Sequence, residues 1–135
     1  MGCGQGRDAV WLARAGHLVT GIDPSIVGVS QLQRIVAKQN LAIDAQVANM
    51  ETYQATRLFD CVLFDRTLHM LPVKDRIAGF ARLLDRVGPA GCVVVLDEAP
   101  NLAELETEIP YGWDWIWGGK SDFAYRRPLA SSGRS

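Results

Sequence analysis

The sequence predicts an α/β fold in which a mostly parallel, doubly wound sheet is flanked by helices. Short apolar segments rich in β-branched residues alternate with longer segments whose apolar residues recur at helical spacing. A glycine-rich loop precedes the first helical segment, and polar residues follow the ends of the apolar segments. In open α/β sheets, ligands bind at these carboxyl ends of strands. We expect one domain over residues 1–127 and a disordered tail over residues 128–135.

Composition and charge exclude several classes of protein. The 135 residues include 14 Lys and Arg against 15 Asp and Glu, so no positive excess favours nucleic acid or an anionic membrane. No apolar run approaches the roughly 20 residues of a membrane-spanning helix. No signal-peptide pattern is present. We therefore expect a cytoplasmic protein with neither a nucleic-acid nor a membrane partner.

The cysteines predict neither a disulfide framework nor a metal site. Cys3, Cys61 and Cys92 are far apart, odd in number and without C-x-x-C spacing. Cys61 and Cys92 stand in apolar runs, which favours a role as small core residues.

The glycine-rich loop is suited to close contact between the main chain and a ligand. Gly2, Gly4 and Gly6 alternate with other residues just before a helix-like segment. Glycine adopts positive φ without penalty, and a loop entering a helix presents free N–H donors at the positive end of the helix dipole. A dinucleotide loop of the form G-x-G-x-x-G would need glycine at position 7, where Arg7 stands. A flexible arm is the alternative, which the pattern of the following segments disfavours.

The G-x-G-x-G spacing resembles the first motif of the class I S-adenosylmethionine-dependent methyltransferases. The resemblance implies that Gly2, Cys3, Gly4 and Gly6 approach the cofactor. In that family a central strand ending in an acidic residue precedes the loop, and no such strand stands before Gly2. We therefore expect a chain that lacks the first strand of the fold, as a fragment or late-called start of a longer protein.

The segment after the loop predicts a helix, a strand and a second helix. Gly16 is placed to end the first helix, and Pro24 or Ser25 to open the second. The predicted ranges are 8–15, 18–22 and 26–40.

Asp23 follows the strand at residues 18–22, at the position where α/β units recognise ribose hydroxyls. A carboxylate accepts two hydrogen bonds from a diol. The alternative is an Asx turn before Pro24. The glycine loop favours the ribose role, and we include both Asp23 and Pro24 among the predicted cofactor contacts.

A third strand over residues 42–48 ends at Asn49 and Met50. The family resemblance implies that this pair reads the adenine edge, where an acidic residue is common. An amide can both donate to and accept from a purine. A polar strand end without a ligand is the alternative for Asn49.

The strand predicted at residues 59–65 ends at Phe64 and Asp65, which the resemblance places beside the sulfonium. The following T-L-H-M-L-P run resembles a V-L-H-H-L-P run of small-molecule methyltransferases. Within it, His69 is a candidate base because imidazole exchanges protons near neutral pH. The alternative is a structural histidine whose ring nitrogens are hydrogen-bonded within the protein.

The remaining segments predict a helix at 73–87, a G-P-A-G turn at 88–91 and a buried strand at 92–98. Asp97 and Glu98 then line a pocket or are solvated. A short helix is expected within 101–109. Trp113, Trp115 and Trp117 alternate, which predicts three indoles on one face of a strand that pairs with residues 123–127 as an antiparallel edge. A lid over an apolar substrate is the alternative for the indoles.

The resemblance implies methyl transfer from S-adenosylmethionine to a small-molecule acceptor by in-line displacement. His69 then assists only if the nucleophile carries a proton. Two alternatives remain open: an NAD-dependent oxidoreductase, because a glycine loop plus Asp23 also suits a dinucleotide, and a non-catalytic remnant. In the remnant, a missing central strand leaves backbone groups unpaired, at about 1–3 kcal/mol each.

Overall fold

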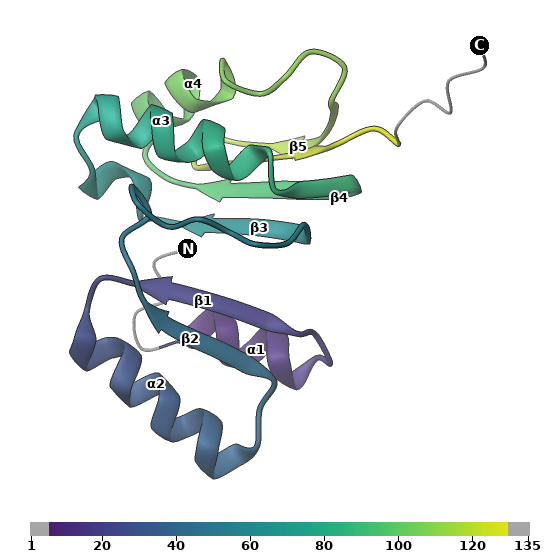
Figure 1. The fold of residues 1–135 in the computed structure, drawn as a ribbon. Helices are drawn as coiled ribbons and strands as arrows, with labels where there is room; N and C mark the ends of the chain where they lie inside the picture. The colour runs from purple at the N-terminus through teal and green to yellow at the C-terminus, as the bar shows by residue number, and fades with distance from the viewer. Residues whose placement is uncertain (1–5, 130–135) are drawn as a thin grey trace. The chain divides into compact units, whose positions relative to one another are not determined.

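The computed structural model describes residues 6–129, which contain both α-helices and β-strands (Figure 1). The chain divides into two compact units, residues 1–53 and residues 54–135. Parallel strand pairs and an antiparallel edge are both present, in agreement with the predicted fold class. The predicted tail lies outside the described residues from residue 130 onward, and the single domain stays a prediction.

The first unit is a parallel two-stranded sheet with two helices. β1 and β2 pair in register from Val19 opposite Ile43 to Asp23 opposite Val47. Both helices pack on a shared apolar cluster that includes Ala9, Val29 and Leu32. The elements are α1 (Arg7–Arg14), β1 (Val19–Asp23), α2 (Ile26–Gln39) and β2 (Ile43–Val47).

The helix ends of the first unit follow from local residue chemistry. Gly16 has φ +97° directly after the last residue of the α1 cap, which confirms its predicted role as a terminator. Ser25 begins α2, because its Oγ accepts a hydrogen bond from the N–H of Gly28 at 3.1 Å. Asn40 ends α2 in the left-handed region, at φ 52°.

Gly6 is required at its position by both conformation and space. It is the N-cap of α1, is buried and has φ +84°. A Cβ there would stand 2.3 Å from Cδ1 of Leu32, a residue with no exposed surface. The last glycine of the loop therefore lets α1 approach α2 within the first unit.

The second unit is a four-stranded sheet with the strand order β3-β4-β6-β5 (Figure 1). β3 and β4 are parallel, whereas β6 pairs antiparallel with both β4 and β5. The elements are β3 (Phe59–Asp65), the 3-10 helix η1 (Leu68–Met70), α3 (Val73–Leu84), β4 (Val87–Leu96), α4 (Ala99–Glu106), β5 (Asp114–Gly118) and β6 (Asp122–Arg126).

The core of the second unit is built around an aromatic pair. Phe64 of β3 and Phe80 of α3 have no exposed surface, and their rings meet edge to face at 5.4 Å. Each fully buried side chain of this kind contributes about 1.5–3 kcal/mol. The other buried hydrophobic residues of this unit are Ala55, Val62, Leu68, Leu83, Leu84, Val87, Val93, Val95, Leu102, Leu105, Phe123 and Ala124.

The predicted boundary between α3 and the next strand is wrong. α3 ends at Leu84, and Val87 already pairs with Phe59 at the start of β4. The register then jumps to Cys61 opposite Cys92, so the G-P-A-G run is a bulge inside β4. The reason is burial: Val87 has no exposed surface in the sheet.

The bulge in β4 is held by close backbone contacts. Ala90 has φ 62°, and a Cβ on Gly91 would lie 2.9 Å from the carbonyl oxygen of Asp60. Arg127, directly after β6, closes the bulge with three hydrogen bonds. Its carbonyl accepts from Ala90 at 3.1 Å, its N–H donates to Gly91 at 2.8 Å, and its Nη1 donates to Val87 at 2.6 Å.

The predicted C-terminal hairpin is confirmed, but the indole stripe is not continuous. Trp113 precedes β5, and a bulge between Trp115 and Trp117 interrupts the period of two. The side chains of Trp115 and Trp117 stay on the surface, with 59% and 45% exposed. They therefore do not form the packed face that the alternation predicts.

Replacing Gly6 by Ala should destabilise the first unit more than replacing Gly16 by Ala. Both glycines have positive φ, but no atom lies within 4 Å of a Cβ at Gly16. The shared conformational cost is about 1–2 kcal/mol, and overpacking against Leu32 should add about 1–3 kcal/mol for Gly6→Ala alone. Urea unfolding of both variants checks this difference, and equal losses would contradict the packing role.

Candidate functional site

In the first unit, the predicted cofactor residues gather at one edge of the sheet. α1 runs antiparallel to β1 over a short connection (Figure 1). The N-cap of α1, Gly6, therefore lies at the same end as Asp23, the last residue of β1. Asn49 follows β2 at that edge, because β1 and β2 are parallel. Gly2, Cys3 and Gly4 lie outside the described residues.

Asp23 is held at this edge by its own turn. The N–H of Ser25 donates to Asp23 Oδ1 at 2.8 Å, so the Asx turn considered as the alternative is present. The N–H of Ala48 donates to the Asp23 carbonyl at 3.0 Å. A carboxylate has lone pairs for about four hydrogen bonds, so the turn orients Asp23 without excluding a further donor. Pro24, which follows, is exposed.

Asn49 opens a tight turn after β2, and Met50 is the next residue in that turn. The Asn49 carbonyl accepts from the N–H groups of Thr52 and Tyr53 at 3.1 and 2.9 Å. Asn49 is exposed, whereas Met50 is 9% exposed. The amide thus stands at the surface of the edge and the thioether beneath it.

In the second unit, β3 and β4 end together with Asp65 opposite Leu96. Arg66 turns the chain away with φ 53°, and its N–H donates to the Leu96 carbonyl at 2.8 Å. Asp65 is partly exposed. The Phe64 side chain belongs to the core with Phe80, which leaves its backbone as the part available to a ligand.

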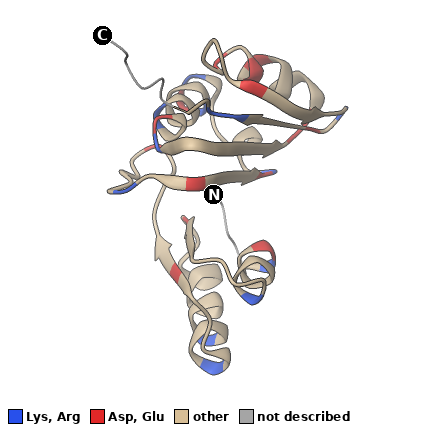
Figure 2. Cartoon of the chain, turned by 90° about the vertical axis from the view of Figure 1, so that its right-hand side faces the viewer, with Lys and Arg blue, Asp and Glu red and all other residues tan. Residues whose placement is uncertain are grey.

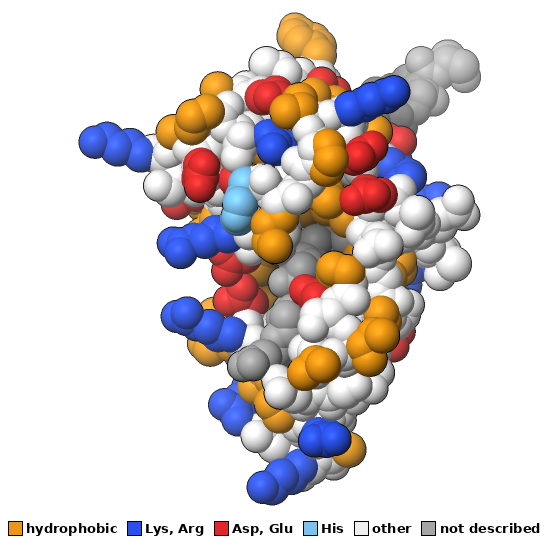
Figure 3. All heavy atoms as spheres, turned by 90° about the vertical axis from the view of Figure 1, so that its left-hand side faces the viewer, with side chains coloured by type: hydrophobic (Ala, Val, Ile, Leu, Met, Phe, Trp, Pro, Cys, Tyr) orange, Lys and Arg blue, Asp and Glu red, His pale blue; other side chains and the backbone are white. Residues whose placement is uncertain are grey.

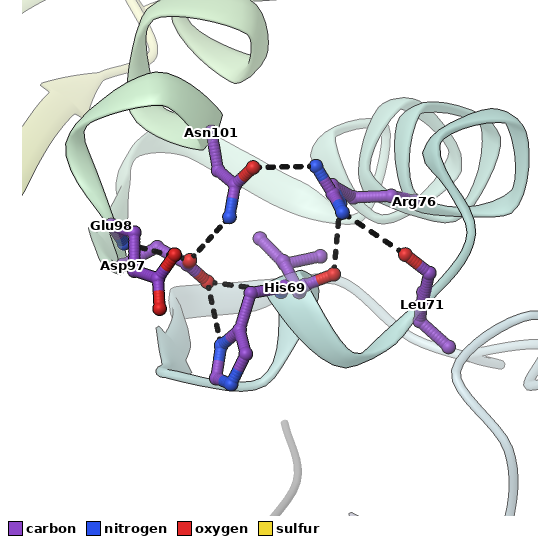
Figure 4. A network of polar contacts seen from close by, with 7 residues as sticks. His69, Leu71, Arg76, Asp97, Glu98 and Asn101 are labelled. Atoms are coloured by element: carbon purple, nitrogen blue, oxygen red, sulfur yellow. Dashed lines mark hydrogen bonds and ion pairs between the residues drawn. The ribbon is translucent and has the colours of Figure 1, made fainter.

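Directly after β4, a buried carboxylate connects three segments (Figure 4). The Asp97 side chain has no exposed surface. Its Oδ1 accepts from the Glu98 N–H at 2.8 Å and from Asn101 Nδ2 at 3.0 Å, and its Oδ2 accepts from the His69 N–H at 3.2 Å. The Nδ1 atom of His69 lies 3.6 Å from the same Oδ2.

Arg76, on α3, holds the segments around Asp97 in place through hydrogen bonds. It is only 7% exposed and donates from Nε to the Leu68 carbonyl at 2.9 Å and from Nη2 to the Leu71 carbonyl at 3.0 Å. Its Nη1 donates to Asn101 Oδ1 at 2.7 Å. Asn101 therefore has its amide orientation fixed, because its oxygen faces Arg76 and its nitrogen faces Asp97 (Figure 4).

The donors around Asp97 keep it ionised. Burial alone would raise the pKa of Asp97, because it disfavours the charged form. The hydrogen bonds from Asn101, Glu98 and His69, together with the charge of a protonated His69, outweigh burial and hold this pKa below the ordinary 3.8.

Asp97 is the site residue that the sequence placed least well. Asp97 is buried rather than solvated, and its carboxylate accepts the hydrogen bonds that form the network. Two signals could have identified it: it directly follows the apolar run of β4, and Asn101 stands four residues later at the start of a helix. Glu98, in contrast, is exposed, as the solvated alternative expects.

The expectation that Cys61 is a core residue is wrong. Cys61 is exposed on β3, and Cys92 opposite it on β4 is half-buried. A hydrogen bond with Cys61 and, to a lesser extent, the charge of Arg126, opposite Cys92 on β6, together lower the pKa of Cys92 to about 7 against the effect of burial. The same hydrogen bond, together with burial, raises the pKa of Cys61.

Other surface features give no second site within residues 6–129. No helix there is both long and apolar enough to cross a membrane. No group of three or more metal-ligating side chains meets in that part of the chain. Charges of both signs are interspersed (Figure 2), and exposed hydrophobic side chains are scattered among them on the face in Figure 3.

The α/β fold and the polar strand ends agree with the class I methyltransferase type that the sequence resembles. Residues 1–91 match the family described as a methyltransferase domain. The chain therefore belongs to this methyltransferase domain family, which confirms the predicted resemblance. S-adenosylmethionine is the cofactor of this class, as predicted.

Several solved structures share the fold. The N-methyltransferase NodS from Bradyrhizobium japonicum WM9, in complex with S-adenosyl-L-homocysteine, is 16% identical with a TM-score of 0.78, and the match covers 94% of this chain and 75% of that one. The magnesium protoporphyrin IX methyltransferase ChlM from Synechocystis PCC 6803, with bound S-adenosylmethionine, is 19% identical with a TM-score of 0.78, covering 93% and 67%. At these identities the likeness concerns the fold.

Other relatives carry different activities in their names. The S-adenosyl-L-methionine-dependent Diels-Alderase iccD of Talaromyces variabilis is 30% identical over 115 residues, covering 81% of this chain and 39% of that protein. This chain thus spans well under half the length of that curated relative. The [4+2]-cyclase SpnF matches with 14% identity and a TM-score of 0.76, over 96% of this chain and 74% of that one.

Asp97→Asn should lower stability at neutral pH by about 1–3 kcal/mol, because donors to the carboxylate lose a charged acceptor. A carboxyl whose pKa is lowered by folding stabilises the protein above its ordinary pKa and loses that effect as pH falls through the folded value. The difference between wild type and variant should therefore persist down to about pH 4 and shrink below it. Urea unfolding across this range measures it, and a difference constant down to about pH 2 would contradict the assignment.

Cys92 should react as a thiolate near neutral pH. With a pKa of about 7, roughly half of it is ionised at pH 7, against about one per cent for an ordinary thiol with a pKa of 9.0. Iodoacetamide labelling, followed by peptide mass spectrometry, should show a midpoint near pH 7 for Cys92. In Cys61→Ala the midpoint should move up by about one unit or more, because the donor is lost.

Proposed function

We propose that this chain binds S-adenosylmethionine at the carboxyl edge of the β1–β2 sheet and transfers its methyl group to a small-molecule acceptor. One observation carries the proposal: Gly6 and Asp23 stand at the same end of the first unit, in a chain of the methyltransferase domain family. A carboxylate on the opposite end of the sheet would have removed the basis for an adenosine site.

The residues at this edge suit a nucleoside. Asp23, oriented by its Asx turn, would accept hydrogen bonds from the ribose diol. The exposed Asn49 has both a donor and an acceptor for the adenine edge, and Met50 would supply apolar contact. The N-terminus of α1 at Gly6 adds N–H donors. Contributions of Gly2, Cys3, Gly4, Pro24, Phe64 and Asp65 remain predictions.

The protein's task in such a reaction is alignment rather than activation. When bound, S-adenosylmethionine supplies a methyl carbon already activated by a sulfonium. The chain then needs to hold the acceptor in line with that carbon and exclude water, which accounts for a large part of such rate enhancements.

A second candidate function keeps the cofactor but not the methyl transfer. The names of two relatives, a Diels-Alderase and a [4+2]-cyclase, favour a ring-forming reaction in a fold of this kind. The two functions differ in the fate of the methyl group. With methyl-labelled S-adenosylmethionine and panels of phenols, amines, thiols and polyenes, methyl transfer moves the label to the acceptor, whereas ring formation leaves it on the cofactor.

Asp23→Ala should weaken binding of S-adenosylhomocysteine by roughly 10- to 100-fold, because a charged acceptor contributes about 1.5–3 kcal/mol. Asp44→Ala is the matched control, since Asp44 lies near the amino end of β2, away from the carboxyl edge of the same sheet. It should bind like wild type. Calorimetry with S-adenosylhomocysteine and NAD in parallel tests the cofactor as well: preference for NAD would favour the oxidoreductase alternative. Absence of binding to either would support the remnant.

A further inference from the structure

We propose that Asp97 is a positioning residue that holds His69 in the tautomer protonated on Nδ1, so that Nε2 accepts a proton from the acceptor molecule. The acceptor is then an apolar compound whose nucleophile carries a weakly acidic O–H or N–H. The chemistry assigned to His69 rests on the proposed function, whereas the tautomer is a property of the chain itself.

The geometry places one ring nitrogen against the carboxylate and the other away from it. Nδ1 of His69 lies 3.6 Å from Asp97 Oδ2, which is an ion-pair distance longer than a hydrogen bond, and such contacts often tighten when a ligand binds. Figure 4 shows Nε2 on the side of the ring turned away from Asp97. The His69 side chain is 35% exposed and that of Asp97 is fully buried, so Nε2 is the nitrogen available to a ligand.

The carboxylate decides which nitrogen carries the proton. An ionised carboxylate only accepts hydrogen bonds, so it attracts an N–H on Nδ1 and repels a lone pair there. The tautomer of a histidine is set by the partner of one nitrogen, which leaves the other as acceptor. Asp97 cannot turn away, because Asn101 and the Glu98 N–H both hold its Oδ1. Arg76 fixes Asn101 in turn.

A purely structural role would explain only part of these contacts. The bonds from the Glu98 N–H and the His69 N–H tie the start of α4 to η1 without using the imidazole. They do not require Nδ1 beside Oδ2. A purely structural role therefore predicts no preferred tautomer of the His69 ring, whereas the positioning role predicts a proton on Nδ1.

The surroundings of His69 favour an apolar acceptor. Met70, its neighbour in η1, has 77% of its surface exposed, and Val73 at the start of α3 has 52% exposed. Exposed apolar side chains on the same chain segment as the base suit a ligand with a hydrophobic body and one ionisable group, such as a phenol.

The proton transfer balances without a further reactant. Nε2 takes the proton as the O–H or N–H bond of the acceptor breaks, and Asp97 stabilises the resulting imidazolium. The electron pair left on the acceptor forms the new bond to the methyl carbon while the carbon–sulfur bond breaks. His69 then releases the proton to water.

Nitrogen-15 NMR tests the tautomer directly in the full chain. The sequence contains two histidines, and the exposed His17 serves as an internal reference. At a pH where both rings are neutral, two-bond ¹H–¹⁵N spectra should show His69 protonated mainly on Nδ1. A wild-type His69 protonated mainly on Nε2 would overturn the proposal, whatever the variants do.

Asp97→Asn should reverse the tautomer. Two donors, from Glu98 and Asn101, meet Oδ1 and only one, the His69 N–H, meets Oδ2, so the amide oxygen of the variant should take the Oδ1 position and turn its NH₂ toward His69. That group donates to Nδ1 and forces the proton onto Nε2. Asp85→Asn, at the exposed end of α3, is the isosteric control and should leave the tautomer unchanged.

Kinetics separate positioning from structure. With a phenol acceptor that wild type methylates, Asp97→Asn and His69→Ala should each lower kcat roughly 100-fold or more while KM and S-adenosylhomocysteine affinity change little. A folded Asp97→Asn protein with normal turnover would refute the positioning role. If the wild type fails to bind S-adenosylhomocysteine, the proposed function fails, but the NMR result on Asp97 and His69 stands or falls separately.

Discussion

Parallel pairing of strands is the constraint from which the candidate site follows. Two parallel neighbours need a crossover connection, and here β1 and β2 are joined by α2 while β3 and β4 are joined by η1 and α3. Their carboxyl ends therefore meet at one edge within each unit. Polar residues that are far apart in the sequence become neighbours there without any specific attraction between them, so a site can be assembled from strand ends alone.

Local chemistry made much of the fold predictable. The helix and strand order, the Ser25 cap and the glycine and asparagine terminators depend on neighbouring residues and are visible in the sequence. The placement of Gly6 and Asp23 at one edge followed as well, because a single helix–strand unit determines it. What the sequence missed depends on partners elsewhere in the chain. Val87 enters the sheet because of burial against distant residues, which helical periodicity cannot indicate.

The hydrogen-bond network around Asp97 could likewise not be predicted from neighbouring residues. His69 was recognisable as a residue type in a motif, but its partner Asp97 lies 28 residues away and is identified only by the contacts that surround it. Similarly, Cys61 is exposed although it stands in an apolar run whose neighbours Val62 and Phe64 are buried, so the run did not indicate its exposure. Sequence patterns thus indicated which groups are reactive, and the fold determined which of them act in pairs.

The contacts of Arg127 with the bulge in β4 have a consequence for where this chain can be cut. Its three hydrogen bonds hold the beginning of β4, although Arg127 itself comes after the last strand. A protease or a cloning boundary that removes Arg127 would leave all strands intact in sequence, yet release the irregular start of the strand that joins β3 to β6. The C-terminal limit of a usable domain is therefore defined by a residue outside its regular secondary structure.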